Sequence, residues 1–103
     1  MKPLAVEDGA DAELRAAIIR YEEERPGLGA QLWDEIQRTL SLIQERPGIG
    51  ERVRRIRVKG VARRFPVRRF PYFVVYREQR ELIQIVAFAH HRQRPGYWRS
   101  RGR

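Results

Sequence analysis

Cysteine is absent from this 103-residue sequence, and histidine occurs only twice. Without thiols the fold can use neither disulfides nor a thiolate metal site, and no third ligand is spaced for a zinc ion. We therefore expect no metal and no cofactor.

Long apolar segments are also missing. No run approaches the roughly 18 apolar residues that a membrane-spanning helix needs. The first eight residues contain no extended apolar stretch and no small-residue cleavage site of the kind found in signal peptides. We expect a cytoplasmic protein with no membrane partner.

Acidic side chains are scarce in the second half of the chain. Residues 51–103 carry 16 basic and 3 acidic side chains, a net charge of +13, whereas residues 1–50 carry 6 basic and 10 acidic side chains, a net charge of −4. Of the 22 basic residues, 20 are arginine, whose guanidinium can bind phosphate or carboxylate through two parallel hydrogen bonds. The second half therefore predicts an anionic partner. Nucleic acid, an acidic protein and an anionic membrane would each suit this charge.

The first half predicts two amphipathic helices. Apolar residues recur at i, i+3, i+4 and i+7 across residues 14–21, and a second apolar stripe covers residues 32–43. Trp33 belongs to the second stripe and is expected in the core. Two such helices joined by a short loop form a hairpin that must lie on another element.

The ends of both helices are marked by local signals. Asp8 or Asp11 is expected to cap the first helix by accepting its free amide hydrogens, and the second helix is expected to begin after Gly29. Both helices are expected to end at Arg-Pro-Gly, residues 25–27 and 46–48, because the residue before a proline is disfavoured in the helical region.

The second half alternates with a period of two residues, which is typical of β-strands. We expect strands at residues 55–59, 64–68, 70–76 and 82–89. The last two are joined by the charged connection 77–81 and form an antiparallel hairpin. Because residues 82–89 are nearly continuous in apolar side chains, that strand is expected to be covered on both faces near the middle of a sheet.

These elements predict an α+β domain spanning residues 1–103. An N-terminal helical hairpin packs on one face of a mainly antiparallel, twisted β-sheet, and the other face or rim is rich in arginine. Residues 4–6 add an edge strand, and Pro66, which has no N–H to donate, favours an edge or a bulge. Residues 99–103 are expected to form a mobile tail.

The end of the last expected strand gathers imidazoles, guanidiniums and large aromatic rings, and we expect the working surface there. His90 and His91 are adjacent, so their side chains are expected to point to opposite faces and at most one can serve a given site. His91 is either structural or a general base with Arg92 beside it. Tyr97 and Trp98 either anchor a partner or fold back to cap the core.

Several features together resemble one known group of proteins. They are the Pro-Gly-Leu-Gly turn between the two helices, the Val75-Tyr76 pair, and the segments Arg-Arg-Phe-Pro-Val-Arg-Arg-Phe-Pro-Tyr (63–72), Ala-His-His-Arg (89–92) and Pro-Gly-Tyr-Trp (95–98). In this order they resemble the RelE/ParE superfamily, the toxins of type II toxin–antitoxin modules, over nearly all of residues 14–101. The resemblance implies a RelE/ParE-like fold and a growth-arresting toxin. It also implies a cognate antitoxin, which usually wraps an acidic or amphipathic C-terminal segment over the toxin.

The superfamily divides by mechanism. RelE-like members cut mRNA in the ribosome, whereas ParE-like members poison DNA gyrase. RNA cleavage needs a base, an acid and cations directed at the phosphate. The resemblance implies an arginine in nucleases where this chain has Phe73, an arginine matched by Arg92, and a functional tyrosine where this chain has Trp98, beside Tyr97. This partial match favours a gyrase poison without catalytic activity, and a ribosome-dependent mRNA endonuclease is the alternative.

Roles for individual residues follow from the charge pattern and the resemblance. The residues expected to bind the target are Arg92, Arg94, Tyr97 and Trp98. Four arginines are expected to alternate across a strand, namely Arg63, Arg64, Arg68 and Arg69. Of these, the antitoxin or another anion is expected to bind Arg64, Arg68 and Arg69. If the protein is a nuclease, the catalytic residues are His91, Arg92 and Tyr97. A plain nucleic-acid-binding module is the alternative outside the superfamily.

Overall fold

The computed structural model of the chain describes residues 1–53 and 61–101. In chain order the elements are β1 (Leu4–Val6), α1 (Asp8–Glu24), α2 (Leu28–Glu45), the 3₁₀ helix η1 (Pro47–Ile49), β2 (Glu51–Arg52), β3 (Ala62–Pro66), β4 (Tyr72–Glu78) and β5 (Ile83–His90). Within the described residues the strands form one five-stranded sheet in the order β1-β5-β4-β3-β2. Neighbouring strands are antiparallel except β1, which runs parallel to β5.

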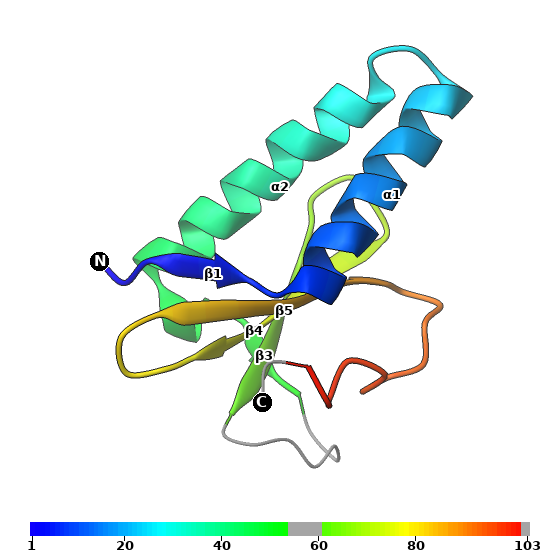
Figure 1. Ribbon diagram of the computed structural model, residues 1–103. Coiled ribbons are helices and arrows are strands. Elements are labelled where there is room, and N and C mark those ends of the chain that lie inside the picture. The colour runs from blue at the N-terminus through cyan, green and yellow to red at the C-terminus, as the bar shows by residue number, and fades with distance from the viewer. Residues whose placement is uncertain (54–60, 102–103) are drawn as a thin grey trace.

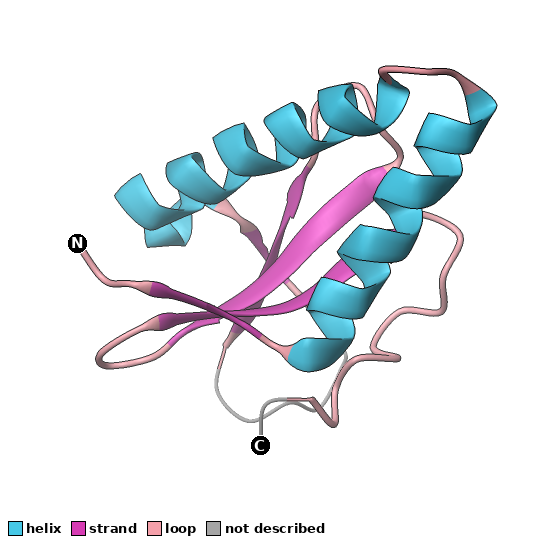
Figure 2. Ribbon diagram, turned by 45° about the horizontal axis from the view of Figure 1, so that its top comes forward, coloured by secondary structure: helices cyan, strands magenta, loops and turns pink. Residues whose placement is uncertain are grey.

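The two helices form an antiparallel hairpin on one side of the sheet (Figure 1), and the chain that follows β5 lies on the other side. Figure 2 shows the same two layers with the helices above the twisted strands. The predicted α+β arrangement of a helical hairpin on a mainly antiparallel sheet is therefore confirmed. No helix in the described part of the chain combines the length and the apolar character that crossing a membrane would require.

The predicted hairpin of two strands is the centre of the sheet. β4 pairs with β5 from Tyr72 opposite His90 to Glu78 opposite Ile83, with a shift of register between Val75 and Tyr76. The shift places Val86 and Ala87 in succession on the same side of the sheet, so alternation is interrupted there. This bulge, together with cover on both faces, explains why residues 82–89 read as a continuous apolar run.

Apolar side chains are buried on both faces of the sheet. On the helical side the core contains Leu14 and Ala17 of α1, Leu32, Ile36 and Ile43 of α2, and Val74, Tyr76, Ile85 and Phe88 of the sheet. On the opposite side a smaller cluster contains Ala62, Val75, Val86, Ala87, Ala89 and Trp98. The second face is therefore partly covered by the C-terminal segment, and the expected cover of residues 82–89 on both faces is confirmed.

The helix boundaries differ from expectation at their starts. Glu7, and not Asp8 or Asp11, caps α1 by accepting a hydrogen bond of 2.8 Å from the Gly9 N–H. The second helix begins at Leu28, directly after Gly27. Gly27 has a φ of 91°, which favours a residue without Cβ. Both helices end as predicted, directly before the two Arg-Pro-Gly sequences.

Three other expectations need correction or lie beyond the described residues. Trp33 is 40% exposed and not in the core, because Leu32 and Ile36 take the inward face of α2. Arg68 and Arg69 lie in the turn between β3 and β4 and do not continue the alternation of Arg63 and Arg64. The strand expected at residues 55–59 lies outside the described residues.

Near the C-terminus Arg101 forms ion pairs with Glu7 and Glu13. Pro66 meets its expectation, since it ends β3 beyond the two residues that pair with β2. The N–H of Val67, the next residue, donates to the Tyr72 carbonyl of β4. Successive N–H groups of a strand point to opposite sides, so the ring nitrogen of Pro66 points away from β4, at a level where β2 has already ended.

Candidate functional site

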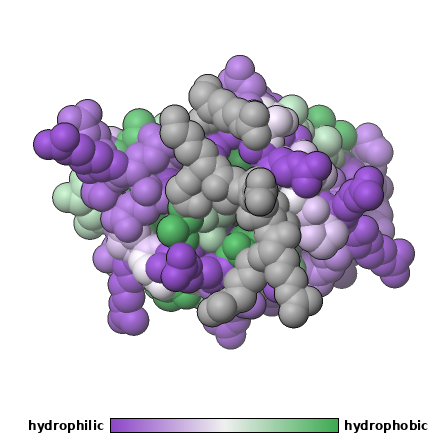
Figure 3. Space-filling view, turned by 90° about the horizontal axis from the view of Figure 1, so that it is seen from below, coloured by the Kyte–Doolittle hydropathy of each residue, from purple (hydrophilic) through white to green (hydrophobic). Residues whose placement is uncertain are grey.

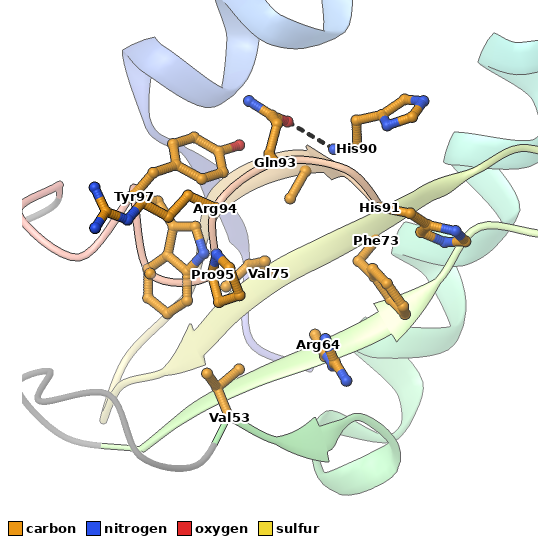
Figure 4. A pocket seen from close by; sticks show the side chains of 13 residues that line it. Val53, Arg64, Phe73, Val75, His90, His91, Gln93, Arg94, Pro95 and Tyr97 are labelled. Atoms are coloured by element: carbon orange, nitrogen blue, oxygen red, sulfur yellow. Dashed lines mark hydrogen bonds between the residues drawn. The ribbon is translucent and has the colours of Figure 1, made fainter.

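A small hollow lies between the second face of the sheet and the loop that follows β5 (Figure 4). Its volume is about 80 Å³, far smaller than a site for a drug-sized ligand. The lining residues come from β3, β4, the end of β5 and the loop, and they include Arg64, Phe73, His91, Gln93, Arg94 and Tyr97. Among the described residues that line it, none is acidic. The hollow is therefore suited to a small anionic group.

The ring of Phe73 is held between two cationic or basic side chains. The guanidinium carbon of Arg64 lies 4.6 Å from the centroid of the Phe73 ring, and the His91 ring centroid lies 4.6 Å from the same centroid. Figure 4 shows Arg64 of β3, Phe73 of β4 and His91 after β5 in this order across the strands. Arg64 also faces Glu51 of β2 at 3.7 Å, a loose and exposed ion pair that contributes little. The guanidinium therefore remains available to an anion from solvent.

The two histidines lie on opposite sides of the loop, as the sequence predicted. His90 packs edge-on against Tyr72 with the ring centroids 5.2 Å apart, on the helical side. Its Nδ1 accepts a hydrogen bond of 3.0 Å from the Arg92 N–H. Burial, followed by the positive charge of Arg92, lowers the pKa of His90 below its ordinary value, so the neutral ring is favoured. His91 is exposed beside Phe73.

Tyr97 and Trp98 are more buried than residues that only anchor a partner would be. Trp98 is only 3% exposed and packs in the second apolar cluster with Val75 and Ala87, so the alternative in which it caps the core describes its position. Tyr97 is half-buried, and its hydroxyl donates to the Glu13 carboxylate of α1. Burial and this hydrogen bond raise the pKa of Tyr97 well above its ordinary value.

The arginines named from the sequence fall into three groups. Arg64 and Arg94 line the hollow, Arg92 is exposed on the loop beside it, and Arg68 and Arg69 are exposed in the β3–β4 turn. Arg69 has a positive φ of 71° and donates to Gln31 of α2 at 3.1 Å. On the face opposite the helices, hydrophilic side chains dominate the outline and only small apolar patches show (Figure 3).

Sequence reasoning missed Glu13, whose carboxylate contacts β5, Tyr97 and Arg101. It also missed Arg20, which donates to the Tyr72 hydroxyl from α1. The sequence contains a weak signal for Glu13, which directly precedes Leu14 of the apolar stripe. A carboxylate so close to the core is partly buried and needs a hydrogen-bond partner. Across residues 1–53 and 61–101, no group of histidine and acidic side chains is arranged to hold a metal ion.

Comparisons with known proteins concern the fold and the family of the chain. No curated protein matches the chain. A solved structure of the chromosomal ParDE TA system from P. aeruginosa is similar to it, with 23% sequence identity, a TM-score of 0.72, and a match that covers 87% of this chain and 96% of that chain. That likeness confirms the fold. The model of the ParE toxin of the type II toxin–antitoxin system, parDE, matches residues 4–95, and the chain therefore belongs to the ParE toxin family.

Proposed function

We propose that this ParE-family toxin arrests bacterial growth by poisoning DNA gyrase, and that its antitoxin neutralises it by covering the basic surface. The observation that favours gyrase over mRNA cleavage is the ring of Phe73 beside Arg64 and His91. RNA cleavage requires cations directed at the phosphate, and a neutral ring stands where the superfamily resemblance implies an arginine in nucleases. The loss of one well-placed donor costs about 3 kcal/mol of transition-state stabilisation.

The residues that a nuclease would use are also poorly gathered. The hydroxyl of Tyr97 is engaged with Glu13 on the far side of the loop, and Arg92 is not among the residues that line the hollow with His91. A base, an acid and a phosphate ligand must all reach one phosphodiester group. The arrangement therefore supports a binding function more than a catalytic one.

The loop after β5 supplies a surface suited to a large partner. Arg92 and Arg94 are exposed and Tyr97 is half-exposed, whereas Trp98 lies beneath them in the apolar cluster. Arginine and tyrosine are enriched among the residues that dominate protein interfaces. We assign target contact to Arg92, Arg94 and the exposed edge of Tyr97, with Trp98 supporting the loop from below.

Antitoxin binding is assigned to a second set of arginines. Arg68 and Arg69 are exposed in the β3–β4 turn, and the guanidinium of Arg64 is open to solvent at the hollow. An acidic C-terminal segment could lie across this region and form hydrogen bonds with the guanidiniums. Such a segment would also approach Arg94.

The proposal is tested by comparing the wild type with an Arg92→Glu/Arg94→Glu variant in a gyrase supercoiling assay and in an expression host without antitoxin. We expect the wild type to inhibit gyrase, to arrest growth and to induce the DNA-damage response. The variant should lose inhibition by at least about tenfold, as expected when two hot-spot arginines are reversed.

A charge-matched control is available at the C-terminal ends of the two helices. Arg25→Glu/Arg46→Glu changes the net charge equally at exposed positions next to the helix ends, and should inhibit gyrase like the wild type. Messenger RNA should stay intact in every case. Codon-positioned mRNA cleavage that is abolished by His91→Gln would overturn the proposal and make the protein an endoribonuclease.

A further inference from the structure

Glu13 of α1 is the point where the C-terminal segment is attached to the rest of the fold. Its side chain is 19% exposed and its two carboxylate oxygens accept hydrogen bonds from three donors. The Phe88 N–H of β5 donates at 3.2 Å, the Arg101 Nη1 donates at 2.7 Å, and the Tyr97 hydroxyl also donates. One carboxylate therefore joins a helix, a strand and the tail.

These contacts also complete an unfinished edge of the sheet. The parallel pairing of β1 with β5 ends where the Glu7 N–H donates to the Ile85 carbonyl at 2.9 Å. Beyond that point β5 still has an outward carbonyl at Val86 and an outward N–H at Phe88. Arg101 donates to the Val86 carbonyl at 3.3 Å and Glu13 accepts from Phe88, so this ion pair takes the place of a neighbouring strand.

Arg101 is held from several directions as well. Its guanidinium carbon lies 5.2 Å from the centroid of the Tyr97 ring, its Nε is 3.8 Å from the Glu7 carboxylate, and its own carbonyl accepts a hydrogen bond from Arg77 of β4. Between these fixed points Trp98 is inserted in the second apolar cluster. The segment from residue 91 to residue 101 is thus fastened at its end by charge and in its middle by burial.

We infer that Glu13 is a positioning residue, which holds residues 91–101 in the conformation that presents Arg92 and Arg94 to the target without contacting the target itself. This inference rests on the proposed function of the loop. A partly buried carboxylate with three donors restrains those donors strongly, because each loses a charge-assisted hydrogen bond if the carboxylate is removed. A loop fixed before binding also avoids the entropy cost of ordering on the target.

The experiment uses Glu13→Gln, with Glu23→Gln as the matched control. Both residues are glutamates of α1, but Glu23 is exposed on the stretch of the helix near the hairpin loop. Both variants are made in a Trp33→Phe background, so that fluorescence reports on Trp98 alone. For Glu13→Gln we expect a red-shifted emission, faster hydrogen exchange over residues 91–101, and gyrase inhibition about tenfold weaker, the equivalent of one charge-assisted hydrogen bond. Glu23→Gln should match its parent in all three.

A spectroscopic signature separates positioning from general loss of stability. Because the Glu13 carboxylate helps to raise the pKa of Tyr97, the phenol should ionise at lower pH in Glu13→Gln while the thermal unfolding transition remains cooperative. If Glu13→Gln does not fold, Tyr97→Phe removes only the phenol hydroxyl that donates to Glu13. It should give a smaller red shift of the Trp98 emission and a smaller increase in hydrogen exchange over residues 91–101.

The possible failures can be told apart. Hydrogen exchange in Glu13→Gln equal to that of the control overturns the inference. The inference is also overturned if Glu13→Gln shows faster hydrogen exchange over residues 91–101 but inhibits gyrase fully, provided that Arg92→Glu/Arg94→Glu has lost inhibition. If even the wild type leaves gyrase unaffected, the proposed function fails, and the exchange and fluorescence measurements alone decide whether Glu13 holds the loop.

Discussion

At the scale of single residues, the structure separates two histidines that the sequence could only place side by side. His90 is packed against Tyr72, and its Nδ1 accepts the Arg92 N–H, an arrangement that requires an unprotonated nitrogen. His91 packs instead against Phe73, with the ring centroids 4.6 Å apart. The first histidine therefore couples the loop to pH, and the second does not share that contact.

This coupling predicts a loss of stability in mild acid. The pKa of His90 is lowered in the folded state, so the unfolded chain binds more protons once the pH falls to about 6.5, the ordinary value for histidine. The free energy of unfolding should then decrease as the pH falls below that value. Urea unfolding between pH 5 and pH 8 measures this, with His90→Gln expected to flatten the dependence. An unchanged slope in His90→Gln, or an equal flattening in His91→Gln, would assign the effect to other groups.

The same scale shows where sequence reasoning fails. Trp33 and Leu32 are neighbours in one apolar stripe, yet Leu32 is 1% exposed and Trp33 is 40% exposed. A stripe of apolar residues does not specify which side chains at its margin reach the core, because the partner surface decides this. Trp98 shows a choice that the sequence left open, between anchoring a partner and capping the core, and contact with Val75 and Ala87 on the second sheet face decides for the core.

At the scale of elements, the helices and the β4–β5 hairpin could be predicted because each follows from local periodicity and turn residues. An edge strand at residues 4–6 could be predicted, but its parallel pairing with β5 could not, since three residues carry too little pattern to specify a partner. The bulge at Val86 of β5, opposite Val75 and Tyr76, was also hidden. One inserted residue interrupts the alternation, and the sequence then has the same pattern as a strand buried on both faces. The attachment of Glu13 to β5 depends on contacts 75 residues apart.

The close approach of the two helices gives a prediction at this scale. A Cβ on Gly29 would lie 2.7 Å from the Ile18 carbonyl oxygen and 3.0 Å from the Glu22 carboxylate that accepts its N–H. Overpacking costs about 1–3 kcal/mol, and better helix propensity returns at most about 1 kcal/mol. Gly29→Ala should therefore lower the free energy of unfolding by about 1–2 kcal/mol.

Gly48→Ala is the control for this substitution, because a Cβ there meets nothing within 4 Å. It should unfold at the same urea concentration as the wild type. Equal stability of Gly29→Ala and Gly48→Ala would show that α1 and α2 can separate without cost.

At the scale of the whole molecule, the charge asymmetry of the sequence becomes an arrangement in space. The carboxylates of the first half that lie nearest the C-terminus, Glu7 and Glu13, are engaged by Arg101. The exposed arginines of the β3–β4 turn and of the loop after β5 lie in stretches of sequence that contain no acidic residue. The positive field therefore gathers on these two segments, where an anionic partner would be attracted.

This arrangement predicts how the toxin holds its antitoxin. Affinity for the antitoxin of the same module should fall as salt rises, because attraction between exposed charges is screened over about 8 Å at physiological ionic strength. Arg68→Glu/Arg69→Glu should weaken the complex by about tenfold at low salt and make its salt dependence shallower, since two attractive charges become repulsive. The positive φ of Arg69 is not a confounding factor, because glutamate is as strained there as arginine.

Isothermal titration calorimetry at several salt concentrations measures both effects. The Arg25→Glu/Arg46→Glu protein has the same net charge as the Arg68→Glu/Arg69→Glu protein but changes exposed positions at the helix ends. If the two proteins bind equally, the overall charge of the toxin drives association and no particular face is responsible. If only the Arg68 and Arg69 variant binds weakly, the antitoxin lies over the β3–β4 turn. An antitoxin there would lie next to Arg64 and the loop that we propose to bind the target, so we would expect neutralisation and target binding to compete for one surface.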